Sequence, residues 1–144
     1  LNNFFLNPFM EYLRKKYICK NQIKKGLYGT RDIIKFLNKK NCIALMIDQR
    51  VSEGVKIPFF KKIALTTSLP AQLALKYNYE IVPIFISRNK ENKFEMEVQE
   101  PIKILDAKFS DRNKIGLSTI LNEVLEKMII KSNGQWIWTH NRWK

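Results

Sequence analysis

The segment IALMIDQR, residues 43–50, places five apolar side chains directly before three polar ones. The run at 43–47 is too short for a helix and does not alternate in polarity, so it predicts a strand buried on both faces. Polar residues that follow such a strand line the ligand crevices of α/β sheets. Asp48 and Gln49 are therefore candidate binding residues, with a cap of the next loop as the structural alternative.

Downstream of this segment, the pattern predicts one helix and a second buried strand. After a connection over residues 51–67, Ser68 can open a helix over 70–77. Residues 81–87 alternate too little for a strand that faces solvent. A strand, a helix and a strand in this order form a right-handed crossover between parallel strands. This unit places the chain in the α/β class.

One more strand and three helices complete the predicted fold. Residues 94–98 alternate apolar and polar side chains, which predicts a half-buried strand joined to its predecessor by the polar hairpin at 89–93. The expected architecture is thus a mixed sheet with flanking helices. The predicted helices are one capped by Asn7 and ending near Tyr17, one over 30–37, and one with an apolar stripe from 117 to 129 that includes Ile120.

The chain is strongly basic. Lys and Arg number 26 against 13 acids, which gives a net charge of +13 over 144 residues, and residues 1–41 hold ten of the basic residues with two acids. Such a field attracts nucleic acid, anionic lipid or an acidic protein. The longest apolar run is far shorter than the ~18 residues that span a bilayer, so any membrane contact of these residues is expected to be peripheral.

The cysteine and histidine content argues against a metal or redox site. Cys19 and Cys42 have no CxxC spacing, and His140 is the only histidine. No cofactor and no metal are predicted, and reduced cytosolic thiols are expected. Cys42 would open the first buried strand and lie in the core. Because the first residue is Leu1 rather than Met, the start is expected to be a truncation.

The C-terminal segment QWIWTHNRW, residues 135–143, mixes aromatic and basic side chains. Stacking of nucleic-acid bases on Trp136, Trp138 and Trp143 is one interpretation. Alternation at 136 and 138 fits an edge strand packed on the core better, and no RNA-recognition signature accompanies it. A basic nucleic-acid-binding module is the less favoured alternative, and no nucleic-acid partner is predicted. His140 is interpreted as a hydrogen-bonded structural imidazole.

Several short motifs follow one another along the chain in a distinctive order. They are Asn7-Pro8, Lys25-Gly26-Leu27-Tyr28-Gly29-Thr30-Arg31, Asp48-Gln49-Arg50, Glu53-Gly54, Ile57-Pro58-Phe59-Phe60, Ala64, Thr66, Ala71-Gln72-Leu73-Ala74, Val82-Pro83, Arg88, Phe94, Pro101 and the tail at 135–143. In this order they resemble the lipid A biosynthesis acyltransferases of the lysophospholipid acyltransferase superfamily. The resemblance extends over nearly the whole chain.

The resemblance implies a reaction, its partners and its location. It implies transfer of a fatty acyl group from acyl carrier protein to a lipid A precursor in lipopolysaccharide biosynthesis, at the cytoplasmic face of the inner membrane. The implied partners are all anionic: the carrier protein, the phosphorylated glycolipid acceptor and the membrane surface. Another glycolipid or a lysophospholipid is the alternative acceptor.

The catalytic pair of that family is missing from these residues. Members carry a His followed after four residues by Asp or Glu, in which the His serves as general base and the carboxylate orients it. The fifth position after His140 lies beyond Lys144. The resemblance therefore implies that residues 1–144 are the C-terminal part of one acyltransferase domain with a glycerol-3-phosphate-acyltransferase-like fold. It also implies a membrane anchor in the missing N-terminal part and no activity of the 144 residues alone.

No catalytic residue is assigned to this chain, and the substrate-binding candidates are Asp48, Gln49, Lys61 and Arg88. Arg88 follows the second buried strand, where it can bind a phosphate or remain a solvated hairpin residue. Asp48 and Arg88 are expected to face one crevice, because they follow adjacent strands of the crossover. Lys61 stands where the family usually has Gly, directly after Phe59 and Phe60. At least one of these Phe is expected in the core, with a membrane contact as the alternative.

Overall fold

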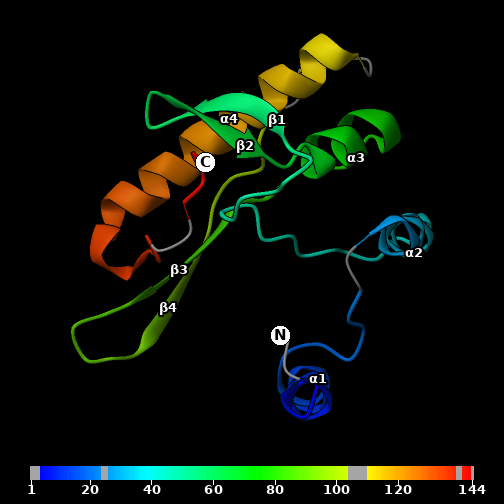
Figure 1. The fold of residues 1–144 in the computed structure, drawn as a ribbon, viewed down its shortest axis with the longest axis vertical. Helices are drawn as coiled ribbons and strands as arrows, with labels where there is room; N and C mark the ends of the chain where they lie inside the picture. Colours follow the sequence, from blue (N-terminus) through cyan, green and yellow to red (C-terminus); the bar gives the residue numbers. More distant parts are fainter. Residues whose placement is uncertain (1–3, 24–25, 104–109, 139–140, 144) are drawn as a thin grey trace. The chain divides into compact units, whose positions relative to one another are not determined.

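The computed structural model describes residues 4–23, 26–103, 110–138 and 141–143 (Figure 1). The chain divides into two compact units, Leu1–Ala44 and Leu45–Lys144. The first unit contains helices, and the second contains both helices and strands.

The first unit contains two helices, α1 (Leu6–Tyr17) and α2 (Leu27–Asn38). α1 ends where the sequence predicts, but it begins after Phe5, so the prediction of Asn7 as N-cap was wrong. Pro8 is tolerated inside the first turn because the N–H groups of that turn have no acceptor within the helix. α2 confirms the helix predicted over 30–37 and begins behind Gly26, whose φ of 105° favours glycine.

The second unit begins its regular structure with an antiparallel hairpin, β1 (Val55–Phe59) and β2 (Lys62–Thr66). The prediction of an irregular connection over 51–67 was wrong. The paired residues Phe59 and Lys62 enclose a two-residue loop, Phe60 and Lys61, in which both residues have positive φ, 49° and 62°. Loops of this kind normally carry Asn or Gly, so nothing in these two residue types signals a turn.

The next elements agree with the sequence. α3 (Leu69–Tyr77) begins with Pro70 in its first turn and ends at Asn78 in the left-handed conformation. β3 (Ile84–Arg88) pairs antiparallel with β4 (Phe94–Val98), which confirms the predicted hairpin. Asn89 holds its loop, because the Oδ1 atom accepts the N–H groups of Glu91 and Lys93.

The predicted parallel crossover does not occur in the part of the chain that the structure describes. Residues 43–47 form no strand, and the described strands make two separate two-stranded antiparallel sheets. A strand requires a hydrogen-bonded neighbour, and no described residue supplies one to 43–47. Met46 is 83% exposed, and Cys42 is exposed rather than buried in the core. The α/β class is confirmed, whereas a mixed sheet with parallel strands is not observed.

The predictions of a buried strand at 81–87 and a half-buried strand at 94–98 were wrong in their burial, because β3 has no buried residue and every residue of β4 is exposed. Residues directly paired in the ladder share one face, and the large apolar side chains of that face are exposed: Ile84, Ile86, Phe94, Met96 and Val98. The opposite face contacts the last residue of the helix α4 (Asp111–Lys131). The Lys131 ammonium lies 5.8 Å from the ring centre of Phe85 and forms an ion pair with Glu97. The sheet therefore has one partnered face and one exposed apolar face.

α4 (Asp111–Lys131) is the helix on which the second unit is assembled, and it packs against both α3 and β1 (Figure 1). Its N-terminus is capped by Ser110, whose Oγ accepts the Asn113 N–H over 3.1 Å. The predicted apolar stripe is buried at Leu117, Leu121, Met128 and Ile129. Ile120 is 43% exposed, so its assignment to the core was wrong.

The residues after α4 form the 3₁₀ turn η1 (Asn133–Gln135) and no strand at 136–138, so the predicted edge strand was wrong. The tail packs through its rings instead. The ring centres of Trp136 and Trp143 lie 5.9 and 5.7 Å from that of Phe59. The indole N–H of Trp143 donates to the Phe59 carbonyl over 3.0 Å. Packing of the tail on the core is therefore confirmed for Trp136, whereas Trp138, the other residue of the predicted alternation, is 52% exposed.

Two apolar clusters flank the middle of α4. Their buried members are Phe59, Ala64 and Ile129 in one cluster, and Ala71, Ala74 and Leu117 in the other. The first cluster joins the β1–β2 hairpin and the tail to the end of α4, and the second joins α3 to its beginning. Between them lie buried polar side chains, which define the candidate site.

Candidate functional site

The loop that carries Asp48 reaches the β1–β2 hairpin by a close backbone approach at Gly54. A side chain at Gly54 would begin with a Cβ atom only 2.7 Å from the carbonyl oxygen of Thr66 and 2.8 Å from its nitrogen. Only glycine permits that approach. The loop after Asp48 is therefore held against the end of β2, where the Thr66 side chain is 3% exposed.

Arg142 of the tail enters the core at the same point. It is 0% exposed, and its guanidinium carbon lies 4.0 Å from the ring centre of Phe59. Its Nη2 donates to the Oγ1 of Thr66 over 3.0 Å and to the Oδ1 of Asn122 over 3.3 Å. Its carbonyl oxygen accepts the Leu65 N–H over 3.4 Å, which fastens the tail to β2.

Asn122 connects this arginine to both strands of the hairpin. It is 1% exposed, and its Nδ2 donates to the Pro58 carbonyl over 2.9 Å and to the Oγ1 of Thr66 over 3.1 Å. Thr66 thus accepts hydrogen bonds from Asn122 and Arg142 alike. We call Thr66, Asn122 and Arg142 the buried triad. It joins β1, β2, α4 and the tail through polar contacts that are shielded from water.

The guanidinium of Arg142 has donors left over. Its Nε and Nη1 atoms have no hydrogen-bond partner among the described residues. Burial lowers the pKa of Arg142, while the carboxylates of Asp48 and Glu126 act in the opposite direction. Both acids therefore lie close enough to act on the buried charge. An arginine remains protonated in such surroundings, so the buried triad carries a positive charge that Asp48 and Glu126 influence at a distance, without a hydrogen bond to its Nε or Nη1.

The candidates from the sequence occupy different surroundings. Asp48 is half-buried and lies near Arg142, whereas Gln49 is exposed. Lys61 is exposed at the tip of the β1–β2 hairpin with a φ of 62°. Glycine would adopt this left-handed conformation without strain, so the structure gives a physical reason to prefer Gly over Lys at position 61.

Arg88 lies at the end of β3 and is held through its backbone. The Gln135 side chain accepts the Arg88 N–H over 2.7 Å and donates to its carbonyl over 2.9 Å. The guanidinium lies over the ring of Phe94 at 4.7 Å, in an open hollow lined also by Asn89 and Asn92. No contact among the described residues joins Arg88 to Asp48. The shared crevice was inferred from a parallel strand pair that these residues do not form.

A model of the bacterial lipid A biosynthesis acyltransferase family matches residues 12–144. The chain belongs to this family. The match confirms the resemblance drawn from the motifs and gives the chain its general class, acyl transfer in lipid A biosynthesis. No curated protein sequence matches the chain. The matched residues include the Asp48 loop, both hairpins and the tail that carries Arg142.

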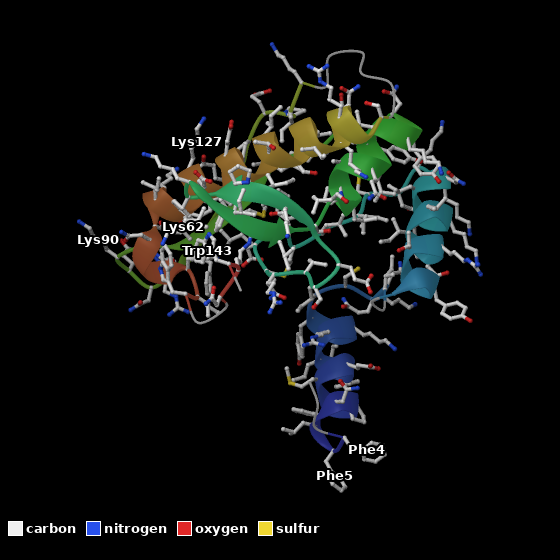
Figure 2. All side chains as sticks on the ribbon, turned by 45° about the horizontal axis from the view of Figure 1, so that its top comes forward. Phe4, Phe5, Lys62, Lys90, Lys127 and Trp143 are labelled. Atoms are coloured by element: carbon white, nitrogen blue, oxygen red, sulfur yellow. The ribbon has the colours of Figure 1, made fainter. Side chains whose placement is uncertain are left out.

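In this acyltransferase chain, Phe59 is a core residue, as expected for at least one of the Phe pair, because it is 0% exposed. Phe60 is half-buried: its N–H donates to the Oε1 of Glu126 over 2.7 Å, and its ring lies 6.2 Å from that of Trp138. Figure 2 shows Trp143 near Lys62, and both residues line a hollow with Phe60. Trp136 and Trp143 of the tail are thus packed against the core, whereas Trp138 is 52% exposed.

Other candidate chemistry is sparse in the acyltransferase chain. Within the described ranges, no group of three or more His, Cys, Asp or Glu residues could hold a metal ion. Cys19 and Cys42 are free thiols on the surface. His140 lies outside the described residues, so its interpretation as a structural imidazole stays a prediction. None of the helices in the described ranges combines the length and the apolar composition that crossing a bilayer requires.

Asn122 and Gln135 were not recognised as site residues from the sequence of this acyltransferase. Asn122 interrupts the apolar stripe of α4 between Leu121 and Val124, and a buried amide on such a stripe is the only signal for it. Arg142 stood within the tail motif but had no role assigned. Nothing in its immediate neighbours, Asn141 and Trp143, signals burial, and only the fold reveals its partners.

Proposed function

We propose that the whole protein transfers a fatty acyl group from acyl carrier protein to a hydroxyl group of a phosphorylated lipid A precursor. The observation that carries this proposal is the family match over residues 12–144, within which Asp48 lies beside the buried cation of Arg142. A different glycolipid or a lysophospholipid as acceptor would retain the same chemistry.

The reaction requires four changes at the reacting atoms. A base removes the hydroxyl proton, the acceptor oxygen forms a bond with the thioester carbonyl carbon, the carbon–sulfur bond breaks, and the protonated base returns the proton to the leaving thiolate of the carrier. We infer that a His-x₄-Asp/Glu pair outside these 144 residues supplies that base. A positioned base contributes about 10²- to 10⁴-fold in rate, so the 144 residues alone are expected to be inactive.

The residues of this chain then bind and orient the substrates. Asp48 and Gln49 are proposed to face the acceptor, because they lie on a loop held against the buried triad. Arg88 and Lys61 are exposed cations suited to phosphate or to acidic groups of the carrier protein. The net charge of +13 favours the approach of all these anionic partners.

Contact with the cytoplasmic face of the inner membrane is proposed for α1 and the residues before it. Phe4 and Phe5 are 86% and 87% exposed, and Figure 2 shows both at the end of the chain before α1. The last turn of α1 carries Arg14, Lys15 and Lys16. Exposed aromatic rings at one end of α1 and cations at the other both favour contact with an anionic lipid surface. The protein should therefore bind anionic but not neutral vesicles and detach at high salt.

The test is an acyl-transfer assay with the protein at its full length. With acyl-loaded carrier protein as donor, we expect product on the phosphorylated glycolipid, less product on the same glycolipid without phosphates, and none from residues 1–144 alone. Product from residues 1–144 alone would contradict the assignment of the base. RNA binding that survives competition by anionic lipid, together with no acyl transfer, would favour the nucleic-acid alternative.

A further inference from the structure

In the buried triad, Arg142 has more hydrogen-bond donors than the described residues have acceptors for them. Nη2 is satisfied by Thr66 and Asn122, but Nε, with one N–H, and Nη1, with two, have no partner among the described residues. A side chain that is 0% exposed gains no contacts with bulk water to compensate. Unpaired donors on a buried charge are costly, so a buried arginine with free donors indicates an acceptor that binds there.

Two acceptors of the right charge lie near the guanidinium, and they differ in what else they bind. Glu126 uses its Oε1 to hold the Phe60 N–H at 2.7 Å, which fixes the tip of the β1–β2 hairpin. Asp48 lies on the loop that Gly54 brings against Thr66, the residue that Nη2 already binds. Because Glu126 is already engaged with the hairpin, Asp48 is the acid near the site that we assign to the free donors.

We propose that Arg142 is the positioning residue of Asp48, and that its free N–H groups hold the Asp48 carboxylate through one buried bridging water molecule, in the direction that faces the acceptor hydroxyl. Arg142 is fully buried and touches no substrate in this arrangement. It acts by fixing a half-buried acid that a short loop alone would leave free to rotate. The facing of Asp48 toward the acceptor rests on the proposed function, whereas the Arg142–Asp48 contact does not.

The first test observes the contact itself, in the protein at its full length and without substrate. The Nε–H group of Arg142 gives its own resonance in a ¹H–¹⁵N NMR spectrum, assigned by its loss in Arg142→Lys. Asp48→Asn should shift this resonance and speed its exchange with water. Glu53→Gln, which removes one negative charge from an exposed position of the same loop, should leave it in place.

Glu126→Gln distinguishes the two acids. A resonance that moves with Glu126→Gln but not with Asp48→Asn would overturn the proposal, because Arg142 would then serve the hairpin rather than the site. A resonance that moves with neither variant would overturn it as well. These outcomes are independent of acyl transfer, so they separate the failure of this proposal from the failure of the proposed function.

The second test uses turnover. Arg142→Met should lower kcat about 10²-fold with little change in KM, because misplacement of one positioned group can cost that much while substrate contacts remain. Arg142→Lys should restore part of the loss, since it keeps the charge but not the planar array of donors. Arg112→Met removes an equal charge from an exposed site on α4 and should leave kcat unchanged.

If Arg142→Met fails to fold, the comparison of Arg142→Lys with the parent protein and the NMR test of Asp48→Asn still decide the matter. Equal losses of turnover and of folded protein in Arg142→Lys, with no movement of the resonance in Asp48→Asn, would show that Arg142 only fastens the tail.

Discussion

Gln135 binds both backbone polar groups of Arg88: its Oε1 accepts the Arg88 N–H over 2.7 Å, and its Nε2 donates to the Arg88 carbonyl over 2.9 Å. One side chain after α4 thereby fixes the end of β3. Arg142 lies further along the same tail and enters the core next to Asp48. The C-terminal tail therefore fixes Arg88 through Gln135, and it also carries Arg142, which we propose positions Asp48.

Gln135→Leu should lower the stability of the protein, because it removes the side chain that binds the backbone of Arg88 at the end of β3. The change removes two hydrogen bonds at a solvent-exposed position, so we expect the free energy of unfolding to fall by about 1–2 kcal/mol. Gln135→Glu should have a smaller effect, because its carboxylate still accepts the Arg88 N–H. Urea unfolding curves of the three proteins measure the difference. Equal stability of all three would show that the two bonds are not formed in solution.

Lys61→Gly should stabilise the β1–β2 hairpin. Lys61 has a φ of 62°, and a left-handed conformation costs a residue with a side chain about 1–2 kcal/mol. Glycine removes this cost, but it also increases the conformational entropy of the unfolded chain, which offsets part of the gain. We expect a gain of about 0.5–1 kcal/mol in the free energy of unfolding.

Lys62→Gly is the matched control, because it removes the same charge one residue later, inside β2. It should destabilise the protein by about 0.5–1 kcal/mol. Thermal unfolding of both variants measures the contrast, and a loss of stability in both would argue against the left-handed loop.

Asn122→Leu should be strongly destabilising. The change leaves the Pro58 carbonyl and the Nη2 of Arg142 with one partner fewer in a buried site, so we expect a loss of about 2–4 kcal/mol. Glu123→Leu, one residue along α4 on its exposed side, should change stability by no more than about 0.5 kcal/mol. Chemical denaturation measures the free energy of unfolding of both variants. Similar losses would show that the hydrogen bonds of Asn122 in the buried triad contribute no more to stability than an exposed side chain does.

The pair Glu97 and Lys131 should make a small, pH-dependent contribution to stability. The hydrogen bond from Lys131 lowers the pKa of Glu97. Because the folded pKa lies below the unfolded value of about 4.3, the contribution is complete above that pH and is lost as the pH falls through the folded pKa.

Thermal unfolding from pH 3 to pH 7 tests this sign. The parent protein should unfold at a slightly higher temperature than Glu97→Gln near neutral pH, and the difference should vanish in acid. Glu100→Gln, an exposed acid in the connection after β4, should show no such convergence. A difference that grows as the pH falls would contradict the assigned direction.

Local patterns predicted several elements correctly. The alternation at 94–98 and the polar residues before it gave the β3–β4 hairpin, because both signals lie within a few neighbouring residues. The stripe from 117 to 129 gave α4 for the same reason. Where the element depended on a distant partner, prediction failed. Residues 43–47 are apolar enough for a strand, but apolar composition does not supply a ladder neighbour.

The site shows the same division. Asp48 could be proposed as a site residue from its place in an ordered set of motifs, whereas the buried triad near it could not be predicted. Arg142 and Asn122 meet Thr66 only because α4, the hairpin and the tail fold onto one another, across 76 positions in the case of Arg142 and Thr66. The left-handed backbone of Lys61 could not be predicted either, because lysine is not a residue type that favours this conformation.

The turnover of Asp48→Asn, set against its thermal unfolding midpoint, tests the central claim most directly. In the protein at its full length, with acyl-loaded carrier protein and the phosphorylated glycolipid, we expect kcat to fall about 10²-fold or more while the midpoint stays within about 2 °C of the parent protein. An Asp48→Asn protein that keeps its turnover, or that loses turnover only in proportion to its folded fraction, would contradict the account.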